Sequence, residues 1–87
     1  MLLIDKTTTN TESATQTATG TIQVQVSGLK EAKVKLDVSQ DSLPMTYADT
    51  VSKDGIANYQ LASGCAYRFR VVGIGPDEAV SVSVLES

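Results

Sequence analysis

Apolar and polar residues alternate along most of the chain after residue 20. The clearest segment is Thr21–Ser27, in which Ile22, Val24 and Val26 are separated by polar residues. Because successive side chains of a β-strand point to opposite faces, a period of two predicts a half-buried strand rather than a helix. Five further segments with this period are predicted as strands: residues 33–38, 45–52, 56–61, 66–72 and 79–85.

Turn-forming residues separate the predicted strands at nearly regular intervals. Asp54-Gly55 is the strongest turn signal, because an Asp-Gly pair suits the positive-φ positions of tight hairpins. Gly28 and Gly64 mark two more turns, and Pro44, which lacks a main-chain N–H, marks a loop. Short strands with this spacing are typical of an antiparallel sandwich or barrel. We therefore predict an all-β fold: a small antiparallel β-sandwich, immunoglobulin-like or jelly-roll-like, with an extended N-terminal arm.

The N-terminal residues differ in composition from the rest of the chain. Seven threonines between residues 7 and 19 are mixed with Ala, Ser, Asn and Gln. Low hydrophobicity and low charge prevent such a segment from ordering alone, although Thr favours extended structure where an edge strand is available. We therefore divide the chain into a Thr-rich arm, residues 1–19, and a β-sandwich domain, residues 20–87.

Leu2, Leu3 and Ile4 lie at the far end of this arm. Burial of one such side chain stabilises by about 1.5–3 kcal/mol, so three would offset much of the cost of ordering the tether. We predict that they are buried against a partner and make the arm the main anchor. Two alternatives remain: the segment is a flexible, solvated tail, or residues 2–4 form the first strand of the chain's own sandwich.

Length and charge narrow the classes of function. At 87 residues the chain is expected to form one domain. Its seven Lys and Arg against ten Asp and Glu argue against a nucleic-acid-binding surface, which needs clustered positive charge. Asp5 ends the apolar run of residues 1–4, so neither a signal peptide nor a membrane span is expected. We predict a soluble protein that binds neither nucleic acid nor membrane.

The residue types that catalysis needs are missing or badly spaced. The chain has no His, which removes the usual general base and most transition-metal sites. Cys65 is the only cysteine, so no intrachain disulfide forms, and we expect a small, semi-buried residue rather than a nucleophile. Gly73 and Gly75 are followed by Pro76, unlike a dinucleotide loop, which opens a helix. We predict no enzymatic activity and no catalytic or cofactor-binding residues.

Two acidic stretches offer oxygen ligands. Asp37 and Asp41 lie near two serines, and Asp77 and Glu78 follow Pro76 in a predicted turn. Calcium takes about six to eight oxygen ligands, and neither stretch has the ligand spacing of an EF-hand. We interpret both as solvated turns and predict no metal site and no cofactor.

Four of the cations fall in two pairs on predicted strands, Lys33 with Lys35 and Arg68 with Arg70. Each pair projects from one face of its strand, so the four charges form a basic stripe if the two strands are neighbours. One interpretation is a solvated outer face with Asp37 as a partial partner, because such surface pairs contribute little. The other is a docking patch for an acidic protein surface, whose charge would set orientation and association rate.

Several motifs occur in a fixed order between residues 18 and 85. They are an Ala-Thr-Gly-Thr-x-x-Val-x-Val-Ser-Gly lead strand (18–28), an Ala-x-Val-x-Leu-x-x-Ser strand leading to Asp (32–41), an Asp-Gly hairpin, a Gly-x-x-Tyr-Arg-Phe-Arg-Val strand (64–71) and a terminal Val-rich strand (80–85). This order resembles small virion structural proteins of tailed bacteriophages. In those proteins an aromatic residue, often Trp, commonly follows the Asp loop, where this chain has Met45 and Tyr47.

The resemblance implies a β-sandwich that decorates or cements a capsid, or that belongs to the neck or tail of the virion. It also implies the major capsid protein or other virion proteins as partners, a homo-oligomer such as a trimer, and location in a virion assembled in the host cytoplasm. The partner-binding residues that we predict are Leu2, Leu3, Ile4, Lys33, Lys35, Arg68 and Arg70. A carbohydrate- or cell-surface-binding module is the alternative, with Tyr47 as its exposed aromatic residue.

Overall fold

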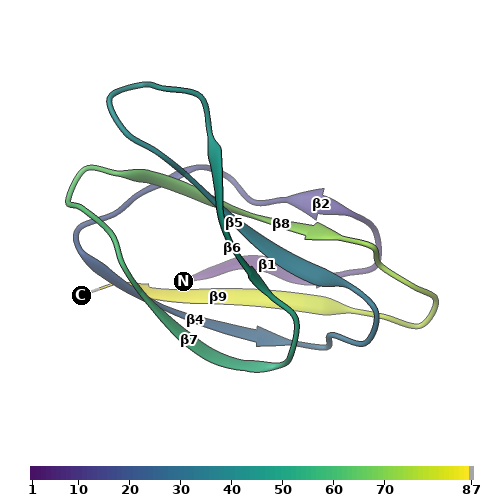
Figure 1. The fold of residues 1–87 in the computed structure, drawn as a ribbon. Helices are drawn as coiled ribbons and strands as arrows, with labels where there is room; N and C mark the ends of the chain where they lie inside the picture. The colour runs from purple at the N-terminus through teal and green to yellow at the C-terminus, as the bar shows by residue number, and fades with distance from the viewer. Residues whose placement is uncertain (87) are drawn as a thin grey trace.

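The computed structural model describes residues 1–86 and has nine β-strands and no helix in that range (Figure 1). The strands are β1 (Leu2–Thr7), β2 (Thr11–Glu12), β3 (Gln16–Thr17), β4 (Thr21–Ser27), β5 (Lys33–Ser39), β6 (Thr46–Val51), β7 (Gly55–Gln60), β8 (Ala66–Val72) and β9 (Val80–Glu86). A helix long and apolar enough to cross a membrane is therefore not found among residues 1–86.

The strands form two antiparallel sheets that pack face to face (Figure 1). Sheet A has the order β1-β9-β4-β7, and sheet B has the order β2-β8-β5-β6, with β3 also pairing with β8. The predicted all-β fold is confirmed, and its two packed sheets are those of a small β-sandwich. The finer class is not confirmed: β8 and β9 lie in different sheets, whereas the last two strands of an immunoglobulin domain lie in one.

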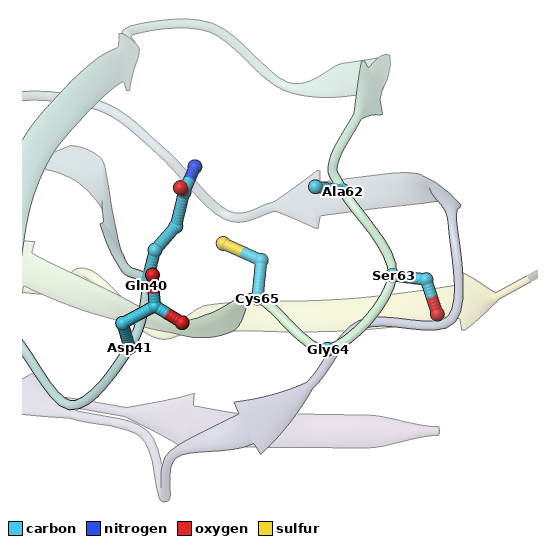
Figure 2. A pocket seen from close by; sticks show the side chains of 6 residues that line it. All are labelled: Gln40, Asp41, Ala62, Ser63, Gly64 and Cys65. Carbon is cyan, nitrogen blue, oxygen red and sulfur yellow. The ribbon is translucent and has the colours of Figure 1, made fainter.

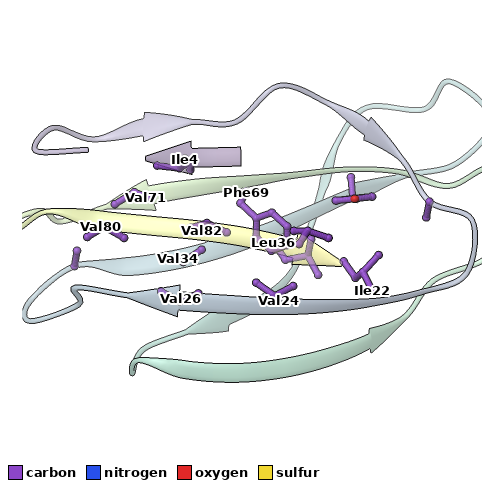
Figure 3. Packing of buried hydrophobic residues seen from close by; sticks show 14 of the residues in the cluster. Ile4, Ile22, Val24, Val26, Val34, Leu36, Phe69, Val71, Val80 and Val82 are labelled. Atoms are coloured by element: carbon purple, nitrogen blue, oxygen red, sulfur yellow. The ribbon is translucent and has the colours of Figure 1, made fainter. Parts of the chain in front are cut away.

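The apolar side chains of the alternating segments fill the core between the two sheets. All six strands predicted from the sequence are present, with ends that differ by no more than one residue. The predicted inward residues of β4, Ile22, Val24 and Val26, are at most 2% exposed. The other strands contribute Ile4, Val34, Leu36, Tyr67, Phe69, Val71, Val80, Val82 and Val84 (Figure 3). Because each such side chain stabilises by about 1.5–3 kcal/mol when buried, this layer holds the sheets together.

The N-terminal segment belongs to both sheets. β1 pairs with β9 in sheet A, and β2 and β3 pair with β8 in sheet B. The Met1 amino group donates to the Val84 carbonyl at 2.7 Å, and the Val84 N–H donates to the Met1 carbonyl at 2.8 Å. The predicted arm outside the sandwich is thus not confirmed, and the alternative of a first strand within the chain's own sandwich is observed. The edges of β8 and β9 offer main-chain groups that pair with an extended segment whatever its hydrophobicity.

The Glu78 carboxylate connects two loops at one end of the sandwich, the β4–β5 loop and the β8–β9 loop, through hydrogen bonds. It is 2% exposed and accepts main-chain N–H groups of Lys30 at 2.9 Å, Ala32 at 3.0 Å and Gly75 at 2.6 Å. Burial alone raises the pKa of Glu78, but these N–H groups favour the carboxylate and lower the pKa to about 2. The interpretation of Glu78 as part of a solvated turn is therefore wrong.

Candidate interaction surface

The four paired cations come together on the outer face of sheet B. β5 and β8 are neighbours, and their register places Lys35 opposite Arg70 and Asp37 opposite Arg68. Side chains directly opposite each other in an antiparallel pair lie about 4.5–5.5 Å apart at Cβ, so these residues form one cluster with Lys33 at its end. The condition for the predicted basic stripe, that the two strands be neighbours, is met.

Asp37 lies at the centre of this cluster, on β5, and is 3% exposed, so its interpretation as part of a solvated turn is wrong. Arg70 donates to it through Nε at 2.5 Å and Nη2 at 3.0 Å, and Arg68 donates through Nε at 3.1 Å. Burial raises the pKa of Asp37, but the hydrogen bonds from Arg70 and Arg68 outweigh this effect and hold the pKa below its ordinary value. Glu12, on β2, adds an ion pair of 3.4 Å to Nη1 of Arg68. The carboxylates of Asp37 and Glu12 therefore offset the positive charge of the two arginines in the stripe.

The lysine half of the stripe has no such partners. Lys33 and Lys35 form no ion pair with any of residues 1–86. Lys35 Nζ lies 5.6 Å from the ring centroid of Tyr47 on β6, within the range of a cation–π contact. The Tyr47 side chain is held by a 2.5 Å hydrogen bond between its hydroxyl and that of Thr50, and the residue is 55% exposed. We call Lys33, Lys35 and Tyr47 the lysine–tyrosine patch.

The three apolar residues predicted as an anchor have different environments. Ile4 is 5% exposed and lies in the chain's own core, and Leu3 is partly buried and packs against that core. Leu2 is 55% exposed and pairs with Ser83 on β9. Of the three, Leu2 alone has most of its surface exposed. In a regular strand Leu2 and Ile4 would share one face, but β1 has a register shift between these two residues, and the sequence does not reveal it.

A pocket lies at the opposite end of the sandwich from Glu78, between residues 40–41 and 62–65 (Figure 2). Cys65 faces this space and is 4% exposed. Its thiol donates weakly to the main-chain carbonyls of Ser39 at 3.3 Å and Ala66 at 3.5 Å. Cys65 is therefore more deeply buried than the semi-buried residue that we predicted from the sequence. Its hydrogen bonds go to main-chain carbonyls, which position the thiol.

The buried acidic groups are already satisfied by the protein. Asp37 accepts guanidinium groups and Glu78 accepts main-chain N–H groups. No three side chains of His, Cys, Asp or Glu within residues 1–86 are placed to hold a metal ion. What the described part of the chain offers chemically is two contrasting sheet faces. Sheet B carries the charged cluster, whereas the outer face of β4 and β9 in sheet A is uncharged: it presents Thr21, Gln23, Gln25, Ser27, Ser81 and Ser83, with the exposed Leu85 opposite Gln23.

Comparisons with known proteins place this chain in no family. No protein-family model matches the sequence. Searches among curated proteins and among solved structures also found no match. A functional proposal therefore depends on the chain's own residues and on the resemblance of its motifs.

Proposed function

We propose that this chain is a structural protein of a bacteriophage virion, and specifically a decoration or cement protein that binds the outside of a capsid shell. The order of motifs between residues 18 and 85 supports this proposal. Its partners are then the major capsid protein or neighbouring virion proteins, and many copies are present per particle. A position in the neck or tail is the variant of this proposal that places the same domain on another part of the virion.

The observation that carries the binding role is the lysine–tyrosine patch. The ammonium group of Lys35 lies over the exposed ring of Tyr47, and Lys33 lies two residues away on the same face of β5. Neither lysine has an ion-pair partner in the described chain, and the net charge of the protein is −3. Tyrosine rings are enriched at protein interfaces, and complementary charge fixes the orientation of a partner. The partner surface that fits this patch is acidic. The arginines contribute less, because Asp37 and Glu12 already engage them.

Mass spectrometry of purified virions tests this proposal. We expect mass spectrometry to detect the protein in many copies per particle, and its absence from particles would overturn the proposal. Particles that lack the protein should bind it when it is added back. Lys35→Glu should weaken this binding at least about tenfold, because a carboxylate would then face an acidic partner. Lys6→Glu, which makes the same charge change at an exposed position of β1, is the matched control and should bind normally.

A carbohydrate-binding role is the second candidate, and the exposed ring of Tyr47 is the observation that favours it. Sugar rings stack on exposed aromatic faces, although Lys35 already lies over one face of this ring. A glycan array with the purified protein distinguishes the two candidates. Binding to a defined glycan that is lost in Tyr47→Ala, together with absence from virions, would establish the second role instead of the first.

A further inference from the structure

The strand β7 forms an edge of sheet A that no part of the described chain covers (Figure 1). It pairs with β4 over its whole length, from Thr21 with Gln60 to Val26 with Gly55, and without a register shift. The Leu61 N–H extends this ladder by donating to the Gly20 carbonyl at 3.3 Å. Hydrogen-bonded and non-hydrogen-bonded pairs alternate along an antiparallel ladder. The N–H and C=O groups of residues 56, 58 and 60 therefore point away from β4, towards the open side.

The other edges of the two sheets carry features that discourage pairing with another chain. β1 has two register shifts against β9 and carries Asp5 and Lys6. β6 has a register shift against β5 and carries Asp49. The remaining edge of sheet B is divided into β2 and β3, which have two residues each. β7 has no charged residue, no proline and no bulge, so it lacks the usual protection of an edge strand.

The uncovered edge is complementary to itself. If two copies of β7 pair antiparallel with Asn58 opposite Asn58, Ile56 of each copy lies opposite Gln60 of the other. Each outward N–H of residues 56, 58 and 60 then faces a C=O of the other copy. The three residue pairs exchange six hydrogen bonds. We propose that two copies of this chain pair in this way through β7, which joins their A sheets into one sheet across a two-fold axis.

The side chains beside this edge are compatible with a second copy. Ile56 is 61% exposed on the outer face, and the paired strand would cover part of it. Gln23 and Gln25, opposite Asn58 and Ile56 on β4, are uncharged, so the net negative charge of each copy is not concentrated at the seam. The Asp49 carboxylate accepts a hydrogen bond from the Tyr59 hydroxyl of β7 at 2.8 Å.

The assembly closes after two copies. A two-fold contact uses the same strand of both copies, so β7 is no longer available for a third. The joined sheet then ends on β1 at both sides, where the register shifts and charges oppose further pairing. This inference does not depend on the proposed virion role, because it uses only the geometry of β7.

The concentration dependence of the oligomeric state tests the pairing. One strand pair buries less area than a standard interface, so we expect a dissociation constant of about 1 μM to 1 mM in sedimentation experiments on the purified chain. Hydrogen exchange gives a residue-specific readout: the amides of Ile56, Asn58 and Gln60 should become protected as concentration rises. A chain that remains monomeric at about 1 mM would overturn the proposal. The open edge of β7 would then be available for pairing with a different protein.

Charge substitutions at the two-fold axis test the register. Asn58→Lys would place two ammonium groups opposite each other and should raise the dissociation constant at least about tenfold. Gln23→Lys is the matched control, because it adds the same charge beside Asn58 on an interior strand and should change the constant less than about twofold. An equal effect of both substitutions would contradict the proposal.

A mixture of two variants completes the test. Asn58→Asp and Asn58→Lys should each dimerise weakly alone, but together they should form a heterodimer that native mass spectrometry detects. Both substitutions are at an exposed position, so each variant should keep the melting temperature of the parent chain. If the two folded variants show no preference for each other, residue 58 does not face its own copy and the proposed register is wrong.

Discussion

Gly28 approaches Ala79 so closely that a Cβ on Gly28 would lie 1.9 Å from the Ala79 carbonyl oxygen. The same glycine has a φ of 87°, and its N–H donates to Asp54 at 3.1 Å. Gly28→Ala must therefore displace main chain as well as adopt an unfavourable φ. We expect it to lower the free energy of unfolding by at least about 3 kcal/mol in chemical denaturation.

Gly64→Ala is the matched control for Gly28→Ala. Gly64 has a φ of 88°, but nothing lies within 4 Å of its added Cβ. The conformational penalty alone is about 1–2 kcal/mol. Equal losses of stability in the two variants would show that the contact with Ala79 contributes nothing and that φ alone matters.

Ile4→Ala tests whether β1 belongs to the isolated domain. Ile4 is 5% exposed in the core, so truncation should lower the free energy of unfolding by about 2–4 kcal/mol without any partner present. Leu2→Ala removes a side chain that is 55% exposed on the same strand and should cost less than about 0.5 kcal/mol. If Ile4→Ala leaves stability unchanged, β1 is not docked in solution and the N-terminal anchor becomes the better description.

Asp37→Asn tests the charged cluster on sheet B. The substitution keeps the shape of the side chain but removes the buried carboxylate between Arg68 and Arg70, so that only the exposed Glu12 still pairs with Arg68. Since hydrogen bonds to charged groups contribute about 1.5–3 kcal/mol, we expect a loss of about 1–3 kcal/mol in the free energy of unfolding at neutral pH. Asp41→Asn, at an exposed position whose φ of 52° Asn tolerates well, should be nearly neutral. A neutral Asp37→Asn would mean that the cluster is not formed in solution.

Glu78 should make stability depend on pH in the acid range. Its pKa of about 2 in the folded protein lies below the ordinary value of 4.5. A lowered pKa means that the unfolded chain takes up the proton first. The stabilisation is therefore complete above about pH 5, and it is lost as pH falls towards 2.

The thermal midpoint measured against pH tests the role of Glu78. Glu78→Gln should melt at a lower temperature than the parent at pH 7, and the difference between the two should shrink steadily as pH falls from about 5 to 2. Asp77→Asn, a neighbouring exposed carboxylate, should follow the parent curve. A constant difference between Glu78→Gln and the parent across this range would contradict the assignment of a lowered pKa to Glu78.

The sequence predicted the strands after residue 20 well, because their burial follows the local period-two alternation of side chains. In β4, β8 and β9 every second residue is apolar, and the strand period alone sends those residues inward. β6 is an edge strand whose residues are mostly exposed. Edge positions bury little, so the alternation that reveals a central strand is faint there.

The N-terminal segment shows where local reasoning fails. Its Thr-rich composition correctly indicated low hydrophobicity, but not where an extended chain would find hydrogen-bond partners. Those partners are the open edges of β8 and β9, up to 83 residues away. The pairing of β1 with β9 is a property of the assembled sheets, and no feature within residues 1–19 encodes it.

For the candidate interaction surface, too, the sequence determined one part and the tertiary structure decided the other. The sequence by itself determined that Lys33 and Lys35 share one side of a strand, and that Arg68 and Arg70 share one side of another, because the side-chain period is two. Only the tertiary structure decided that these strands are neighbours, and that Asp37 and Glu12 engage the arginines and leave the lysines without ion-pair partners in the described chain. It also decided that Glu78 is buried and that β7 is left open. Both depend on which segments distant in sequence meet, and the pattern of each segment does not contain that information.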